Sequence, residues 1–383
     1  MNKLKDKTLL LLSSVGAAAF VFMNLLEHKP NRISQGAKYT SFEFFGNLGI
    51  VIVFLWLILL SLSFYEKKYK NNIVFIFTTI LALVFIWSLQ SKTGIFVEHG
   101  SSARLSLSSG FYVQIFCIYM IFSTYTKRIV EHKYIKWIGF LSIFAILSYF
   151  MFTGALEDLS LIKEYNIKKT QFILNLRIHA MLTLGSVVTG AIIAIPLGFL
   201  AYSKKTLEGK IMVPLSIIET IPSLSLFGIL LVPLSGLGKL PFFDAIGVSG
   251  IGWAPAYIAL TLYTLLPIGR NTLTGFYSVE KNIIEAARGM GMSKGQILKK
   301  IELPLAFPVI FTGIRIAFIQ TIGGAVLAGL VGGGGMGTFV FLGLGEASPD
   351  LILLGVLPIV FFTVFLDYIL RTFEKTMRGV IYD

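Results

Sequence analysis

Cysteine and charge are both scarce in this 383-residue sequence, in which Cys117 stands alone and only 14% of the residues are charged. A single cysteine cannot form an intrachain disulfide, so a small secreted module held together by disulfides is excluded. By contrast, 55% of the residues are hydrophobic and the mean hydropathy is +0.79, which excludes a disordered chain and a nucleic-acid-binding domain. We therefore predict an all-α, polytopic membrane protein.

Residue patterns for metal binding and catalysis are also missing. The four histidines lie far apart in the sequence, and none has a second ligand at metal-binding spacing. Cys117 has no histidine near it, which favours a small buried apolar residue over a nucleophile. The glycine-rich run 332–337 lacks the Lys-Ser/Thr ending of a phosphate-binding loop. We therefore predict no catalytic residue, metal site, cofactor or ATPase site in this chain.

Long apolar runs are frequent, and a transmembrane helix needs about 20 mainly apolar residues. Ten runs approach that length, namely residues 8–26, 44–64, 73–89, 110–125, 137–153, 180–202, 211–234, 252–268, 305–329 and 351–370. We therefore predict about ten transmembrane helices. The first run follows a group of lysines, so a cleaved signal peptide is the alternative to an uncleaved first span.

Lysine and arginine are distributed unevenly among the segments that join these runs. If the N-terminus is cytoplasmic, 22 of the 33 Lys and Arg fall on the cytoplasmic side and ten on the outer side, while Arg315 falls within a run. Membrane proteins usually carry an excess of Lys and Arg in their cytoplasmic loops. We therefore expect both termini to be cytoplasmic.

The composition changes near residue 154. Residues 154–179 carry more charge and place Leu156, Leu159 and Ile162 on one helix face, which is typical of an amphipathic helix at a membrane surface. We therefore predict an N-terminal five-span region (1–153), an interfacial linker helix (154–179) and a second membrane region (180–383).

The longest polar segment of the second region, residues 270–304, predicts a stiff hairpin of two short helices. Ser278 is the expected start of the first helix, and Gly291 stands where a left-handed residue would end it. Ser293 and Gln296 have the spacing of a capping box at the start of the second helix. Pro304 is expected to end that helix. On capping alone, a well-folded loop with a solvated basic surface is the simpler interpretation.

The hairpin also carries a sequence motif. Its residues match every fixed position of E-A-A-x3-G-x9-I-x-L-P, the signature of ABC importer permeases, and residues 170–383 resemble that family. The resemblance implies that the five C-terminal spans form a type I importer permease core. It also implies that the hairpin contains a coupling helix, which docks on a separate ATPase subunit. The residues to which we assign this coupling role are Glu285, Ala286, Ala287, Arg288, Gly291, Ile301, Leu303 and Pro304.

Within that family, the second region is most similar to permeases for osmoprotectants such as glycine betaine, choline and carnitine. The similarity lies in the segments 219–226, 266–271, 284–293, 313–315 and 332–337. It implies a prokaryotic inner membrane protein that works with an ATPase homodimer, a second permease copy or paralogue, and an external substrate-binding protein. ATP and Mg would then be bound by the ATPase. The first region lies outside the resemblance, although longer members of the family are similar in having extra N-terminal spans.

Ionisable and aromatic residues within the apolar runs indicate a solute path. Counting 1.5 Å per residue from the inner surface places Glu219 at about 10 Å and Arg315 at about 15 Å, so we expect a structural ion pair between them. In the alternative, Glu219 faces the path of a cationic headgroup. Pro222 interrupts its run, as at a break that lines a path.

Aromatic faces attract quaternary ammonium groups, although ordinary packing also accounts for any single ring. Together with Asn271, from the matching segment 266–271, the expected path residues are Glu219, Pro222, Ser223, Phe227, Tyr257, Tyr263 and Asn271. Asp367 and Arg371, four residues apart, are expected to pair near the inner end of the last span.

Two other functions remain open from the sequence. A membrane enzyme acting through the N-terminal region would need a paired acid, metal or nucleophile, and none is evident. An ion-coupled secondary carrier would be expected to show an inverted repeat, which the two regions lack. Dependence on a separate ATPase distinguishes the importer from both.

Overall fold

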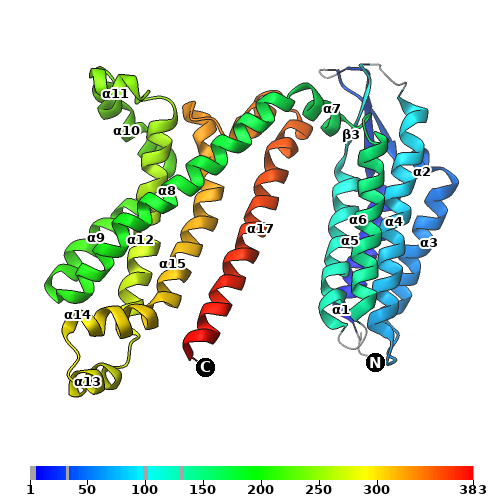
Figure 1. Ribbon diagram of the computed structural model, residues 1–383. Coiled ribbons are helices and arrows are strands. Elements are labelled where there is room, and N and C mark those ends of the chain that lie inside the picture. Colours follow the sequence, from blue (N-terminus) through cyan, green and yellow to red (C-terminus); the bar gives the residue numbers. More distant parts are fainter. Residues whose placement is uncertain (1–5, 32–33, 98–101, 130–132, 383) are drawn as a thin grey trace. The chain divides into compact units, whose positions relative to one another are not determined.

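The computed structural model describes residues 6–31, 34–97, 102–129 and 133–382, and the chain divides into two compact units after Ile167 (Figure 1). Helices make up most of each unit, as predicted for an all-α membrane protein. Each unit is described below by itself.

The first unit is a helical bundle with a small sheet at one end. Its helices are α1 (Lys7–Phe22), α2 (Ser41–Phe45), α3 (Asn47–Leu62), α4 (Lys70–Phe96), α5 (Ser109–Arg128), α6 (Lys133–Thr153) and α7 (Ser160–Ile167). The antiparallel sheet has the order β2-β1-β3 and is built from β1 (Asn24–Lys29), β2 (Ala37–Thr40) and β3 (Arg104–Leu107). The helix expected over 8–26 therefore ends at Phe22, because the residues that follow pair with two strands.

A buried polar contact holds the centre of this bundle together. A Cβ atom at Gly16 would lie 2.3 Å from the Trp56 ring, so glycine is needed for the indole to lie against α1. Trp56 Nε1 donates to Gln114 Oε1 at 2.8 Å, and Gln114 Nε2 donates to the Gly16 carbonyl at 2.6 Å. These groups satisfy one another's hydrogen bonds within an apolar core, which avoids the penalty for unpaired buried polar atoms.

Helix α12 lies at the centre of the second unit and packs against several of its other helices. Its elements are α8 (Lys169–Ser203), α9 (Lys205–Thr220), α10 (Ser223–Leu237), α11 (Pro241–Ala245), α12 (Trp253–Tyr277), α13 (Lys281–Gly289), α14 (Lys294–Ile297), a π-helical turn (Leu298–Glu302), α15 (Leu303–Gly324), a 3₁₀ segment (Ala325–Val331), α16 (Gly337–Gly345) and α17 (Pro349–Tyr382). Helix α12 packs against α8 and α15. A Cβ atom at Gly190 of α8 would lie 1.7 Å from Thr264 Oγ1 of α12, so glycine allows this close approach.

Fewer helices than the expected ten are long and apolar enough to cross a membrane within the part of the chain that the structure describes. Among the described residues, the helical stretches that are long and apolar enough to cross a membrane are Lys70–Thr93, Tyr134–Thr153, Lys169–Ser203, Lys294–Val331 and Pro349–Met377. Helices α9 and α10 meet the same test together, but they are bent by 104° at the break between them. The break expected at Pro222 within the run 211–234 is therefore confirmed. Helices α1 and α3 are apolar but only 16 residues long, so the count of ten is not confirmed.

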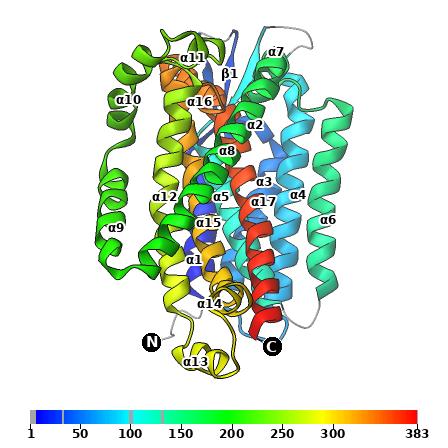
Figure 2. The ribbon, with the colours of Figure 1, turned by 60° about the vertical axis from the view of Figure 1, so that its left-hand side comes forward.

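The segment expected to form one linker helix is divided in the structure. Residues 160–167 form α7 in the first unit, whereas residues 169–179 are the first turns of the long helix α8 in the second. Within the second unit, α13 and the C-terminal end of α17 lie at one end, and α10 and α11 lie toward the other (Figure 2).

Candidate functional site

The hairpin between α12 and α15 presents a short exposed helix. Glu285, Ala286 and Arg288 of α13 are exposed, whereas Ala287 is fully buried. The four residues therefore have two roles, because Ala287 packs inside this chain while the other three are free to contact another molecule. Met290, at the end of α13, is 75% exposed and adds an apolar side chain to the same surface.

The expected turn between the two short helices is confirmed. Gly291 has a φ of +81°, and the Met292 amide donates to the Ala287 carbonyl at 3.2 Å, as in a Schellman motif. The capping box also forms, since the Gln296 amide donates to Ser293 Oγ at 3.4 Å and the Ser293 amide donates to Gln296 Oε1 at 2.8 Å. Each cap satisfies amides or carbonyls that would otherwise be free, so the hairpin has a defined shape.

Two of the expected helix boundaries are wrong. Ser278 ends α12 instead of starting α13, and its Oγ donates back to the Gly275 carbonyl at 2.7 Å. Pro304 does not end the second helix, because Leu303 is helical (φ −65°, ψ −47°) and the chain continues into α15. The π-helical turn directly before Leu303 shifts the backbone hydrogen bonds there. Pro304 therefore stands in the first turn of α15, where a proline is tolerated because its missing amide hydrogen is not needed for the α-helical hydrogen bonds.

Aromatic packing anchors the base of the hairpin. Tyr202, at the end of α8, stacks on Phe276 with ring centroids 5.1 Å apart, and its hydroxyl donates to Glu302 Oε1 at 2.9 Å. Ile284 and Leu298 pack against the same buried cluster as Phe276. The hairpin is thereby packed against the ends of α8 and α12. Sequence reasoning missed Tyr202 and Glu302, because Glu302 occupies a variable position of the motif.

The break between α9 and α10 borders a cavity of about 290 Å³. Four expected path residues line it, namely Glu219, Ser223, Phe227 and Tyr263, and they are joined by Ile221, Leu260, Gln320, Thr321, Gly324 and Leu327. The Tyr263 hydroxyl donates to the Ile221 carbonyl at 2.6 Å, which satisfies a carbonyl set free by the break. Gln320 Nε2 donates to Glu219 Oε1 at 3.3 Å and so directs the carboxylate. The cavity therefore combines one carboxylate with aromatic rings.

The other expected path residues, Pro222, Tyr257 and Asn271, are not among the residues that line this cavity. The Tyr257 hydroxyl is hydrogen-bonded to Thr189 Oγ1 at 2.6 Å, in the contact between α12 and α8. Asn271 Nδ2 donates to the carbonyl of Pro267 at 2.7 Å, within its own helix. Pro222 is the residue that precedes α10. Tyr257 and Asn271 are thus held by hydrogen bonds within the helices of the second unit, and their place in a solute path stays a prediction.

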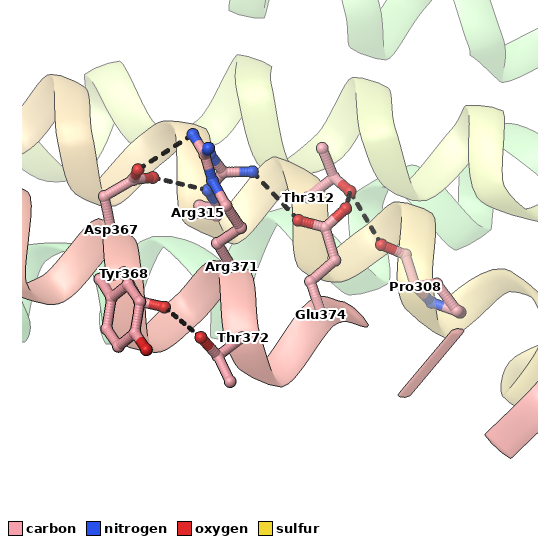
Figure 3. A network of polar contacts seen from close by, with 8 residues as sticks. All are labelled: Pro308, Thr312, Arg315, Asp367, Tyr368, Arg371, Thr372 and Glu374. Atoms are coloured by element: carbon pink, nitrogen blue, oxygen red, sulfur yellow. Dashed lines mark hydrogen bonds and ion pairs between the residues drawn. The ribbon is translucent and has the colours of Figure 1, made fainter. Parts of the chain in front are cut away.

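The ion pair expected between Glu219 and Arg315 is wrong. Arg315 Nε donates to Asp367 Oδ1 at 2.7 Å, and Arg315 Nη1 donates to Glu374 Oε2 at 3.1 Å (Figure 3). Both carboxylates belong to α17, which packs against α15. Counting residues gives the depth of Arg315 but not the face of α15 on which it lies, and that face is turned to α17.

We expect Arg315→Ala to destabilise the protein by about 2–3 kcal/mol, because it removes the one guanidinium that contacts both Asp367 and Glu374 in a largely buried setting. Arg371→Ala is the matched control. Its expected pair with Asp367 is confirmed at 3.2 Å, but the Arg371 side chain is 56% exposed, so the loss should be at most about 0.5 kcal/mol. Thermal unfolding in detergent measures both variants, and equal losses would contradict a special role for Arg315.

Both units match known protein families. Residues 180–379 match the family described as binding-protein-dependent transport system inner membrane component, and residues 3–162 match the N-terminal domain of the ABC transporter permease YehY.

Individual proteins are similar to about half of the chain. The choline transport system permease protein OpuBB of Bacillus subtilis (strain 168) is 38% identical over 199 residues, which are 52% of this chain and 85% of that protein. The glycine betaine/carnitine/choline transport system permease protein OpuCB of the same strain is 37% identical over 204 residues, or 53% of this chain and 87% of that protein. A solved structure of the MetNI methionine ABC transporter in inward-facing conformations covers 55% of this chain and 97% of its own, at 23% identity and a TM-score of 0.47.

Proposed function

Given that this chain belongs to the family of binding-protein-dependent transport system inner membrane components, we propose that it carries a compatible solute with a quaternary ammonium group, such as glycine betaine or choline, into the cell. As a member of this family, it is the permease subunit of an ATP-driven importer and not an enzyme. The ATPase is a separate subunit. Family membership favours neither the secondary carrier nor the membrane enzyme.

The cavity at the α9–α10 break supports this choice of solute. A quaternary ammonium group has no hydrogen to donate, so a protein holds it with aromatic faces and a negative charge. Glu219 provides the charge, and Phe227 and Tyr263 provide the rings. Similar proteins carry the names of choline and glycine betaine transport systems, which agrees with this chemistry.

The exposed hairpin supports coupling to the ATPase. Glu285 and Arg288 offer charges and Ala286 a small side chain, so α13 can seat closely in a groove of a partner. In this proposal the partner is an ATPase homodimer that holds ATP and Mg. Closure of the two ATPase subunits moves α13, and the packing of Tyr202 on Phe276 passes that movement to α8 and α12. A second permease copy or paralogue completes the pathway, and an external binding protein delivers the solute.

The same proposal gives the orientation of the chain. An ATPase is cytoplasmic, so α13 faces the cytoplasm, and the C-terminal end of α17 lies at the same end of the second unit (Figure 2). The excess of lysine and arginine in the predicted inner loops supports a cytoplasmic N-terminus as well.

Solute uptake by the native cells tests the proposed function. Cells that lack this chain should lose uptake of at least one quaternary ammonium solute, and the wild-type chain should restore it. Radiolabelled choline, glycine betaine and carnitine are the solutes to compare, with an amino acid as the control. The proposal fails if uptake of none of the three changes while uptake of another class of solute is lost.

A further inference from the structure

A second cavity, of about 690 Å³, lies within the first unit. It is found where α4 and α6 end and the turn 154–158 leads toward α7. Its wall includes the rings of Trp87 and Tyr149, the carboxylate of Glu157, and the amide of Gln90. Cavities of this size hold small organic ligands.

The two rings are supported from one side and open on the other. Phe150 is 1% exposed, and its ring centroid lies 5.9 Å from that of Trp87 and 5.7 Å from that of Tyr149. Trp87 and Tyr149 themselves are 53% and 58% exposed. Phe150 therefore positions both rings while their remaining surface stays available to a ligand.

Negative charge dominates this wall. Asp158 is neutralised by Lys163, whose Nζ lies 3.3 Å from Asp158 Oδ1 and donates to the Ala103 carbonyl. Glu157 is exposed, and among the described residues that line the cavity there is no lysine or arginine. The C-terminal end of α6 also points its carbonyls toward this turn, which adds partial negative charge.

A left-handed glycine determines where Glu157 lies. Gly154 has a φ of +70°, and the Ala155 amide donates to the Phe150 carbonyl at 3.1 Å, so α6 ends in a Schellman motif. A Cβ atom at Gly154 would lie 2.9 Å from Glu157 Oε1. The carboxylate thus folds back over the glycine, next to the ends of the helices that bear Trp87 and Tyr149.

We propose that this cavity of the first unit binds a quaternary ammonium group, with the faces of Trp87 and Tyr149 and the carboxylate of Glu157 as its contacts. Rings and one unpaired negative charge suit a cation without hydrogen-bond donors. The choice of this cation among organic cations rests on the proposed function. The group has two sources, a free solute such as choline or the headgroup of phosphatidylcholine.

Binding of choline to the purified full-length permease, without any binding protein, tests this inference. The protein is placed in phosphatidylglycerol nanodiscs, and saturation-transfer NMR follows the methyl protons of choline. Trp87→Leu and Glu157→Gln should each weaken binding by roughly fivefold to thirtyfold, the range expected for one ring or charge contact. Gly154→Ala should also weaken it, because alanine is strained at this positive φ and its methyl group lies against the Glu157 carboxylate, while the charge itself is kept.

Three controls define the result. Trp137→Leu removes a 68% exposed tryptophan of the same unit that does not line the cavity, and it should leave binding unchanged. Glu219→Gln alters the cavity of the second unit, and the Glu157-dependent site should persist in it. Melting temperatures confirm that each variant is folded. If choline binds all folded variants as it binds the wild type, the inference is overturned.

Repeating the measurement in a second lipid identifies the source of the quaternary ammonium group. Phosphatidylcholine nanodiscs that abolish choline binding assign the cavity to the lipid headgroup, whereas unchanged binding assigns it to free solute. Failure of the two proposals is distinguishable. If uptake of quaternary ammonium solutes does not depend on this chain but Glu157-dependent binding is retained, only the transport proposal is refuted. Uptake without Glu157-dependent binding refutes only this site.

Discussion

Replacing Gly291 by valine is expected to reduce solute uptake to the level of cells that lack the chain, while the protein still reaches the membrane. Gly291 has a φ of +81°, a conformation that costs other residues roughly 1–2 kcal/mol and that a β-branched residue adopts least readily. Nothing lies within 4 Å of the position of an added Cβ, so the effect comes from the backbone and not from a clash. The turn changes, and α13 no longer meets its partner.

Two variants of the same hairpin serve as controls for Gly291→Val. Gly291→Asn should retain much of the uptake, because asparagine tolerates the left-handed conformation. Gly295→Val adds the same side chain in α14, where there is also open space but no positive φ, and it should have little effect. Uptake is compared at equal membrane levels by immunoblotting. Normal uptake in Gly291→Val would contradict the coupling role of the hairpin.

Replacing Glu219 by glutamine is expected to lower kcat/KM for uptake of a quaternary ammonium solute by roughly tenfold to a hundredfold, or about 1.4–2.7 kcal/mol. A unit charge about 4 Å away contributes up to about 4 kcal/mol near a protein surface, and part of that is lost to solvent in a cavity that is open. The amide keeps the size of the side chain and its contact with Gln320, so the cavity should retain its shape.

Glu208→Gln is the matched control for Glu219→Gln. Glu208 lies on the same helix, α9, but outside the cavity, and a glutamine oxygen can still accept the hydrogen bond from the Tyr277 hydroxyl. Uptake rates measured over a range of choline concentrations give both parameters. Equal kcat/KM values for the two variants would exclude Glu219 from the solute path.

The local features of the second unit were predictable from sequence, and the features that join distant segments were not. The turn at Gly291 and the Ser293–Gln296 capping box depend on residues three to five apart, so their spacing is sufficient to predict them. The predicted start of the first hairpin helix at Ser278 and the predicted end of the second at Pro304 are wrong. Both boundaries depend on how α12 and α15 continue, which the hairpin residues alone do not determine.

The cavity shows the same division. Glu219 is predictable because a charged residue within an apolar run is unusual, and Ser223 because Pro222 interrupts that run. Phe227 and Tyr263 are predictable because aromatic rings suit the expected cation. Gln320, about a hundred residues further along the chain, carries no local signal, and only the packing of α15 brings it to Glu219. In the first unit, the small sheet was missed because β1 directly follows an apolar helix.

Copurification of the ATPase with the tagged full-length chain from its native cells tests the central claim most directly. The wild-type chain and Asp244→Lys, a charge reversal on α11 toward the opposite end of the second unit, should both recover an ATPase, identified by mass spectrometry (Figure 2). Glu285→Lys should recover none, because it reverses the charge on the exposed face of α13. Equal recovery with Glu285→Lys, or no ATPase with the wild type under conditions that preserve another importer, would contradict the account.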